Sequence, residues 1–389
     1  MKILFIAPQP FFRVRGTPIN VRNVLRVLGE AGHEVDLLCY PWGEDLDIPG
    51  VTIHRSPRLP GMREPKIGIS LSKFPLDFLM FFHALGLCWK NRYDLIHAVE
   101  EAAFFGVWLS RIFRCRLIYD VDSSISDQLR DSRSILFRPL ASLAERFEKS
   151  AIRRSAFVLT VCGSLTERVK QLVPDAKTIQ IEDAPLQSSF QEDAEAAAKL
   201  RDELGLGADP VVVYTGNLES YQGVDLLLRA VNIARRQKPD IRCVIVGGEP
   251  GEIERMKKVA DSLDLAKACV FAGKRPMEEM SSFMTLATVL ASPRTKGTNT
   301  ALKIYTYMQS GKPIVATRLA THTQVLDDSS AVLVLPQPDD FAAGIVRALK
   351  EPLLADVLGR EAKARVASQF SQSSFRHRVR TAYQDLSDK

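Results

Sequence analysis

Hydrophobic positions follow two alternating patterns along this chain. Short apolar runs, such as 2–8 and 34–39, border on glycine-containing turns and predict buried strands. Between them, apolar side chains recur three or four positions apart, as in 19–31 ahead of Gly32, and predict amphipathic helices. Strands that alternate with helices are typical of a parallel, doubly wound sheet.

The same alternation begins again at Pro210, after an acidic, alanine-rich connection. We therefore predict an α/β protein of two Rossmann-like domains that face each other across a cleft, with ligands at the carboxyl ends of the strands. The first domain covers 1–185, the second 186–370, and 371–389 form a last helix with one apolar stripe. The expected strands are 2–8, 34–39, 94–97, 116–119, 157–161, 211–215, 242–246, 268–272, 288–291, 313–316 and 331–335.

Composition narrows the class of protein. Of 389 residues, 46% are hydrophobic and 25% are charged, which fits a globular chain and excludes a disordered or fibrous one. The six cysteines form no C-x-x-C pair, which argues against a zinc site or a disulfide framework and indicates a reducing compartment. No uncharged apolar run reaches the roughly 18 residues of a transmembrane helix, and the N-terminus reads as a strand instead of a signal peptide. We expect a cytoplasmic protein.

Positive charge is concentrated in one segment of a chain whose net charge is +6. Residues 55–92 combine seven cations and two acids with an aromatic, apolar stretch, which favours attachment to the inner face of an anionic cytoplasmic membrane. The alternative is a core helix behind a solvated basic loop. No array typical of nucleic-acid-binding modules is present, so nucleic acid is not an expected partner. The residues are Arg55, Arg58, Arg63, Lys66, Lys73, Lys90 and Arg92, with Phe74, Phe78, Phe81, Phe82 and Trp89.

The segment 290–316 carries the strongest indication of anion binding. It reads as a strand, a loop with two cations, three candidate N-cap residues and a helix over 301–310 that ends at a glycine. Exposed amides and the positive end of such a helix, beside basic side chains, suit a diphosphate. The alternative is an ordinary capped helix with solvated cations. The residues concerned are Arg294, Lys296, Thr298, Asn299, Thr300, Lys303 and Gly311.

Other glycine and polar positions follow predicted strands. Gly16 and Thr17, after Arg15, open a helix where Gly16 leaves space for a ligand and Thr17 can cap the helix, or they form a structural turn. His97, which ends a strand ahead of two glutamates, and Asp122 would lie at the cleft, or they are a structural histidine and a helix cap. Gly247 admits a ligand to the backbone or makes a tight turn. Walker A, GxSxG and HExxH motifs are absent from the sequence.

The second half opens with Thr215-Gly-Asn217 and Gln222-Gly223, and a later helix closes with Met308 and Gly311-Lys-Pro-Ile-Val315. In this order the motifs resemble the GT-B glycosyltransferases and, more narrowly, the retaining family 4, the glycosyltransferase group 1 enzymes. The resemblance covers nearly the whole chain. It implies that a nucleotide sugar lies across the second domain with its diphosphate on the helix N-terminus. It also implies that the acceptor sits against the first domain and that the last helix crosses back towards that domain.

The resemblance also assigns residues, and some differ from the family pattern. It implies that the backbone at Lys274 and Arg275 holds the base of the nucleotide. The family usually has an arginine and a lysine where this chain has Asn217 and Gln222, and two glutamates at Thr298 and Thr306; a first-domain histidine falls at Asp122. Either the charges have moved to other positions, or the activity has been lost.

We therefore expect a retaining, hexosyltransferase-type glycosyltransferase that moves a sugar from a nucleoside diphosphate sugar, preferably of UDP, to a polysaccharide or lipid-linked acceptor. A helix dipole and cations can stabilise the leaving diphosphate, so we expect no metal or other cofactor. The alternatives are a sugar-nucleotide 2-epimerase and a degenerate homologue that acts as a binding partner. The expected catalytic residues are Asp122, His97 and Lys303. The expected donor-binding residues are Gly16, Thr17, Gly216, Asn217, Gln222, Gly247, Lys274, Arg275, Arg294, Thr298, Asn299, Thr300 and Thr306.

Overall fold

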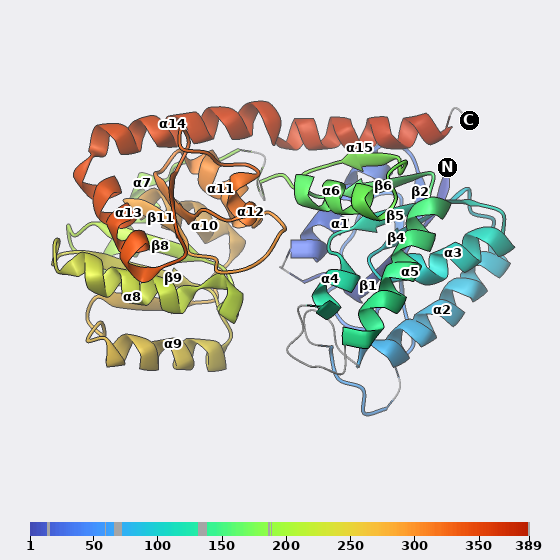
Figure 1. Cartoon of the computed structure of the whole chain (residues 1–389), viewed down its shortest axis with the longest axis horizontal. Helices are drawn as coiled ribbons and strands as arrows, with labels where there is room; N and C mark the ends of the chain where they lie inside the picture. The colour runs from blue at the N-terminus through green and yellow to red at the C-terminus, as the bar shows by residue number, and fades with distance from the viewer. Residues whose placement is uncertain are drawn as a thin grey trace. The chain divides into compact units, whose positions relative to one another are not determined.

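The computed structural model describes residues 1–13, 16–58, 60–65, 72–130, 138–185, 187 and 189–387. Arg15 and Lys66, named above, lie outside these residues. The chain divides into two compact units, each built on one parallel sheet (Figure 1). Unit 1 consists of residues 1–183 and 375–389, and unit 2 of residues 184–374. The prediction of two doubly wound α/β domains is confirmed for each unit taken by itself.

The sheet of unit 1 has seven parallel strands in the order β3-β2-β1-β4-β5-β6-β7. The central strands are almost wholly buried, as expected of parallel strands covered on both faces. The edge strands β3 and β7 are only half-buried, so they lack the continuous apolar run that marked the others, and the sequence analysis missed them. The bounds are β1 Lys2–Pro10, β2 Glu34–Tyr40, β3 Val51–Arg55, β4 Leu95–Val99, β5 Arg116–Val121, β6 Phe157–Thr160 and β7 Thr178–Gln180.

Helices cover both faces of this sheet. On one face α2, α3, α5 and α6 pack on the side chains of Leu4, Ile6 and Ile96. Rings from α2 and α3, and from α3 and α5, are in contact, and Figure 1 shows these three helices side by side. The bounds are α1 Gly16–Glu30, α2 Lys73–Lys90, α3 Ala102–Ile112, α4 Ile125–Arg130, α5 Arg138–Arg154 and α6 Gly163–Leu172. Among the described residues, no helix is both long and apolar enough to cross a membrane.

The last helix, α15 (Gln372–Ser387), packs on unit 1. Its buried stripe is the one that the apolar spacing predicted: Phe375, Val379, Tyr383 and Leu386. Tyr383 stacks on the ring of His97 in β4, which in turn stacks on Phe5 of β1.

The sheet of unit 2 has six parallel strands in the order β10-β9-β8-β11-β12-β13. Its two faces carry separate apolar cores, one with α8, α9 and α13 and one with α7, α10 and α11. The strands are β8 Val211–Thr215, β9 Arg242–Val246, β10 Cys269–Gly273, β11 Val289–Ser292, β12 Ile314–Thr317 and β13 Val332–Val334. The helices are α7 Ala194–Glu203, α8 Val224–Arg235, α9 Pro250–Ser262, α10 Met280–Leu286, α11 Lys303–Ser310, α12 Ala320–Thr323, α13 Pro338–Lys350 and α14 Pro352–Gln369; 220–222 and 277–279 form short 3-10 helices.

Candidate functional site

The candidate site of unit 2 lies where the strand order reverses. β8 and β11 are neighbours in the sheet, but the chain leaves them in opposite directions, and ligands of such sheets bind beyond the carboxyl ends at this point. Two loops meet there, 216–223 after β8 and 293–302 after β11, which we call the switch-point loops. The amide of Thr295 donates to the carbonyl of Tyr221 at 2.9 Å and joins them.

Glycines make the switch-point loops narrow enough for a cation to lie against the backbone. Gly216 has a φ of 136°, and a Cβ there would stand 2.9 Å from the ammonium nitrogen of Lys303. A Cβ on Gly247 would stand 2.2 Å from the carbonyl oxygen of Gly216. A side chain at position 216 would therefore displace the Lys303 ammonium, and one at position 247 would collide with the backbone of Gly216.

Lys303, the first residue of α11, points its ammonium group into the switch-point loops. The Nζ atom lies 3.8 Å above the centre of the Tyr214 ring and donates to Gln222 Oε1 at 3.3 Å. Burial lowers the pKa of this ammonium well below its usual range, and the charge of Arg294 lowers it further. No carboxylate of the described residues forms an ion pair with Lys303, so its charge is not compensated within them.

Arg294 is the second buried cation of these loops. Its Nη1 donates to the Asn299 carbonyl at 2.9 Å and to Thr321 Oγ1 at 2.6 Å, and the guanidinium stacks over Tyr221 at 5.2 Å. Burial lowers the pKa of this guanidinium as well. Among the described residues it has no carboxylate partner, and its Nε makes no hydrogen bond. Three buried side-chain oxygens nearby also lack a hydrogen-bond partner there: Asn217 Oδ1, Thr300 Oγ1 and Thr306 Oγ1. The loops therefore present positive charge and unused polar atoms together.

A buried histidine supports the loop that carries Arg294. His322 is fully buried, with Nε2 2.8 Å from Ser292 Oγ and Nδ1 2.7 Å from the Thr317 carbonyl. The hydroxyl of Thr317 donates to the Arg294 carbonyl at 2.6 Å. Burial lowers the pKa of His322 to about 3, so it stays neutral and positions the loop without adding charge.

The candidate site of unit 1 is a group of carboxylates after β4 and β5. Asp122 accepts a hydrogen bond from Thr17, which favours its charged form. Burial nevertheless raises the pKa of Asp122 well above its usual range, and the charges of Asp120, Glu100 and Asp183 raise it further. Burial also raises the pKa of Asp183 to about 7. These groups can therefore hold protons near neutral pH.

A second set of acids lies on the α2 side of β4. Lys73 pairs with Glu101 at 2.7 Å, and the hydroxyl of Tyr40 donates to Asp77 at 2.5 Å. Burial and then the charge of Glu101 raise the pKa of Asp77 to about 7. Lys73 is thus a paired cation instead of a membrane-facing one.

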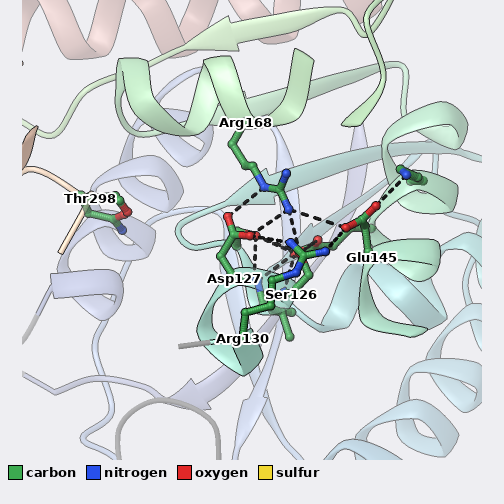
Figure 2. Close-up of polar contacts among 11 residues, drawn as sticks. Ser126, Asp127, Arg130, Glu145, Arg168 and Thr298 are labelled. Carbon is green, nitrogen blue, oxygen red and sulfur yellow. Dashed lines mark hydrogen bonds and ion pairs between the residues drawn. The ribbon is translucent and has the colours of Figure 1, made fainter. Parts of the chain in front are cut away.

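The helix that follows Asp122 has its N-terminus already occupied. The buried carboxylate of Glu148 accepts from the amides of Ile125 and Ser126, at 2.8 and 3.2 Å. Around it Arg168, Asp127, Arg130 and Glu145 point towards one another and tie α4 to α5 and α6 (Figure 2). The amides of α4 are therefore not open to an anionic ligand.

Comparisons with known proteins decide the family. The family described as "Glycosyl transferases group 1" matches residues 197–365, and the "Glycosyl transferase 4-like domain" matches residues 15–181. D-inositol 3-phosphate glycosyltransferase of Acidothermus cellulolyticus is 31% identical over 374 residues, which cover 88% of this chain and 80% of that relative. The chain belongs to the group 1 glycosyltransferases.

Two further similarities extend this result. GDP-mannose-dependent alpha-(1-6)-phosphatidylinositol monomannoside mannosyltransferase of Mycolicibacterium smegmatis is 35% identical over 152 residues, 37% of this chain and 40% of that relative. The structure of sucrose-phosphate synthase from Thermosynechococcus elongatus has a TM-score of 0.80 at 20% identity, with 99% of this chain and 98% of that chain covered. The predicted GT-B fold class and a glycosyltransferase enzyme of the hexosyltransferase type are confirmed.

In this glycosyltransferase nine of the thirteen expected donor residues fall into two groups. Gly216, Asn217, Gln222, Gly247, Arg294, Thr300 and Thr306 lie in or beside the switch-point loops or on α11. Lys303 stands against Gln222, the position where the family resemblance implies a lysine. Lys274 and Arg275 follow the edge strand β10. Lys274 forms an ion pair with Glu249, and Arg275 forms ion pairs with Glu203 and Glu279. The charges of this second pair of residues are therefore already compensated.

Two local expectations are wrong. The helix expected from residue 301 begins at Lys303, with Leu302 before it, so Thr298, Asn299 and Thr300 do not cap it. Thr298 is exposed, and the carbonyl of Asn299 is held by Arg294. Thr17 likewise lies inside α1, after Gly16, instead of capping it.

His97 is not at the end of its strand. It occupies the middle of β4 and is 0% exposed, with Nε2 3.1 Å from Asp120 Oδ2 and Nδ1 bonded to the Tyr383 hydroxyl. Both ring nitrogens thus have protein partners, which leaves none for a substrate hydroxyl. Sequence reasoning missed Tyr214, Tyr221, Tyr383 and His322, because their contacts join distant parts of the chain; only the apolar stripe of the last helix pointed to Tyr383.

Proposed function

We propose that this glycosyltransferase transfers a sugar, with retention at the anomeric carbon, from a nucleoside diphosphate sugar to a saccharide acceptor on a polysaccharide or lipid. The observation that carries the proposal is the pair Lys303 and Arg294, two largely buried cations with no carboxylate partner among the described residues. A buried charge without a partner is costly, and a dianionic diphosphate would supply the missing charge.

The same pair would act on the reaction itself. Negative charge grows on the leaving diphosphate as the glycosidic bond breaks, and cations already fixed in a dry site stabilise it without reorganisation. Asn217, Thr300 and Thr306 have buried oxygens free to meet donor hydroxyls. The proposal needs no metal, because the two cations take the electrostatic role that a divalent ion would have.

The identity of the nucleotide is proposed from similarity. A protein of Anabaena with TM-scores of 0.77 and 0.78 was solved with UDP, with UDP and glucose, and with UDP-glucose, which favours UDP. The mycobacterial relative is named for GDP-mannose, which makes that donor the competing one. The names of relatives that act on inositol phosphate or phosphatidylinositol mannoside favour a polyhydroxylated, lipid-linked acceptor.

On the acceptor side we propose Asp122 as the group that accepts a hydrogen bond from the attacking hydroxyl. Its raised pKa lets it take up a proton near neutral pH, and Thr17 holds its orientation. We assign His97 to positioning Asp120, since both its nitrogens are used within unit 1.

A panel of UDP- and GDP-sugars tests the proposal, with release and transfer of the labelled sugar as readouts and the anomeric configuration of the product read by NMR. We expect turnover with a UDP-sugar and retention. Arg294→Ala should weaken UDP binding about 10- to 150-fold, the equivalent of about 1.5–3 kcal/mol for a charge-assisted contact. Arg360→Ala, which removes an arginine paired with Asp356 on the surface of α14, is the control. Equal UDP affinities of the wild type and Arg294→Ala would show that Arg294 is not part of the donor site. An epimerised donor would show that the protein is a sugar-nucleotide 2-epimerase instead of a transferase.

We also propose that the enzyme works at an anionic membrane surface through α2. Phe74, Phe78, Phe82 and Trp89 of this helix are exposed, Trp89 by 78%, whereas Leu76, Met80 and Ala84 face the core. Some of the charge expected from 55–92 is used internally: Arg55 bonds the carbonyls of Phe11 and Trp42 and pairs with Asp45. Flotation with vesicles tests this, and the triple variant Phe74→Ser, Phe78→Ser, Phe82→Ser should bind less. Equal binding would contradict a role of α2.

A further inference from the structure

A pocket of about 320 Å³ opens between α3 and α5 in unit 1, away from the residues assigned above. Its lining consists of Arg111, Arg146, Ser150, Arg153 and Arg154. Four arginines and one hydroxyl surround a space far larger than the roughly 10–15 Å³ that one water molecule requires. This composition matches an anion and disfavours a cation.

No acidic side chain of the residues that the structure describes neutralises the positive charge of this pocket. None of the four guanidinium groups forms an ion pair with a carboxylate of the described residues, although the nearby Arg130 and Arg168 both do. Within the described part of the chain, Arg154 donates to the carbonyl of Ser110, and the other three guanidinium groups donate no hydrogen bond. Guanidinium forks left open in this way are suited to bidentate contacts with phosphate oxygens.

Helix ends alone do not account for the cluster. Arg111 lies in the last turn of α3, and Arg153 and Arg154 in the last turn of α5, where cations interact favourably with the helix dipole. Arg146 lies two turns earlier, outside the reach of that effect, and still faces the same pocket across Ser150. The spacing of 146, 150 and 153–154 puts these residues on one face of α5.

Exposed apolar side chains lie on the same two helices. Trp108 and Ile112 of α3 are 59% and 57% exposed, and Leu143 and Phe147 of α5 are exposed as well. The Phe147 ring stacks on Phe104 of α3 at 5.5 Å, so the two helices meet beside the pocket. A free anion would gain nothing from apolar side chains around the pocket. A phospholipid presents a phosphate group and acyl chains together, so it can contact both.

We propose that this arginine pocket binds the phosphate of an anionic phospholipid headgroup, while the apolar side chains around it enter the acyl-chain boundary. The inference rests on the membrane attachment proposed above and gives it a specific site: the lipid is recognised by α3 and α5, and α2 contributes apolar contact. Donor binding by unit 2 does not depend on it.

Vesicle flotation of the full chain tests the proposal, with phosphatidylcholine alone and with added phosphatidic acid as the two membranes. The double variant Arg146→Ala, Arg153→Ala should lose the preference for phosphatidic acid, with binding about 30-fold weaker if each cation near the surface contributes as usual. Lys257→Ala, Lys258→Ala removes the same charge from exposed positions of α9 in unit 2 and should bind like the wild type.

Further experiments distinguish a specific phosphate site from non-specific attraction by positive charge, and a failure of this inference from a failure of the proposed function. Arg146→Lys, Arg153→Lys keeps the charge but not the bidentate fork, so it should also bind phosphatidic acid more weakly; binding equal to the wild type would overturn the pocket. Inorganic phosphate that binds as well as the vesicles do would overturn the lipid assignment. Donor hydrolysis is measured in the wild type and in every variant. If none of these proteins hydrolyses the donor, the proposed function alone is overturned. If the wild type hydrolyses the donor but does not float with phosphatidic acid, this inference alone is overturned.

Discussion

At the scale of single residues, the unusual feature of this glycosyltransferase is that unit 2 holds two largely buried cations with no carboxylate partner among the described residues. The charge of Arg294 lowers the pKa of the Lys303 ammonium, and each cation lies over a tyrosine ring, Lys303 over Tyr214 and Arg294 over Tyr221. These uncompensated charges therefore lower the free energy of unfolding of the ligand-free protein. Such destabilisation is usual where a ligand supplies the opposite charge.

Lys303→Met should make the empty protein more stable and the donor complex weaker. The substitution keeps most of the apolar stem but removes the buried charge, so we expect a gain of about 1–2 kcal/mol in the free energy of unfolding without ligand. Stabilisation by added UDP should largely disappear. Thermal unfolding with and without UDP measures both effects, and Lys296→Met, at an exposed position of the same loop, is the control. A less stable empty variant would contradict the argument.

Asp77 should make stability depend on pH. Its pKa is raised to about 7 in the folded protein from an ordinary value near 4, so the folded state binds a proton that the unfolded state has released between these values. The free energy of unfolding therefore falls as the pH rises from about 4 to about 7 and levels off above.

Asp77→Asn cannot titrate and still accepts the hydrogen bond from Tyr40. Relative to the wild type it should gain stability as the pH rises through this window, on the order of 3 kcal/mol at pH 8. Denaturant unfolding at several pH values measures the difference. The exposed Asp47→Asn is the control, and a difference that does not change with pH would show that Asp77 titrates normally.

At the scale of elements, the last helix is held to unit 1 by contacts of two kinds. Tyr383 reaches the buried ring of His97, while Arg376 pairs with Glu30 at 2.6 Å on the surface. In the neutral ring, an Nε2–H that donates to Asp120 leaves Nδ1 to accept the Tyr383 hydroxyl. The buried contact should therefore contribute far more than the surface pair.

Tyr383→Phe should cost about 1–3 kcal/mol of unfolding free energy, because it leaves Nδ1 of His97 buried without a donor. Arg376→Ala should cost at most about 1 kcal/mol, as expected of an exposed ion pair. Denaturant titration of the two variants compares them directly. Equal losses would mean that packing of α15, and not its hydrogen bond to β4, holds the helix in place.

At the scale of the whole molecule, the two units have separate cores and separate probes. All three tryptophans, Trp42, Trp89 and Trp108, belong to unit 1, whereas the proposed donor site belongs to unit 2. A ligand stabilises only the unit that binds it, by about 2.7 kcal/mol at a concentration one hundred times its dissociation constant.

We therefore expect UDP to raise the unfolding temperature followed by calorimetry or circular dichroism, and to move the tryptophan fluorescence transition much less. The comparison needs only the wild-type protein, and UDP with Arg294→Ala is the control. A fluorescence transition that follows UDP as closely as the calorimetric one would show that the units unfold as one cooperative body, or that unit 1 contributes to the donor site.

The sequence by itself determined the architecture of each unit. Strands 211–215 and 242–246 were predicted with the bounds they have, because parallel strands covered on both faces must be continuous apolar runs. It also selected Arg294 and Lys303, because a strand, a basic loop and a helix in this order have one usual arrangement. The edge strands β3 and β7 escaped, since a half-buried strand of three to five residues carries too little apolar signal.

Only the tertiary structure decided which charges are available. Lys274, Arg275 and Lys73 look in the sequence like Lys303 and Arg146, but the first three are paired with acids and the last two are not. Arg275 meets Glu203, 72 positions earlier in the chain. Ion pairs of this kind form between residues that folding brings together, and burial sets their strength, so neither local pattern nor composition can assign them.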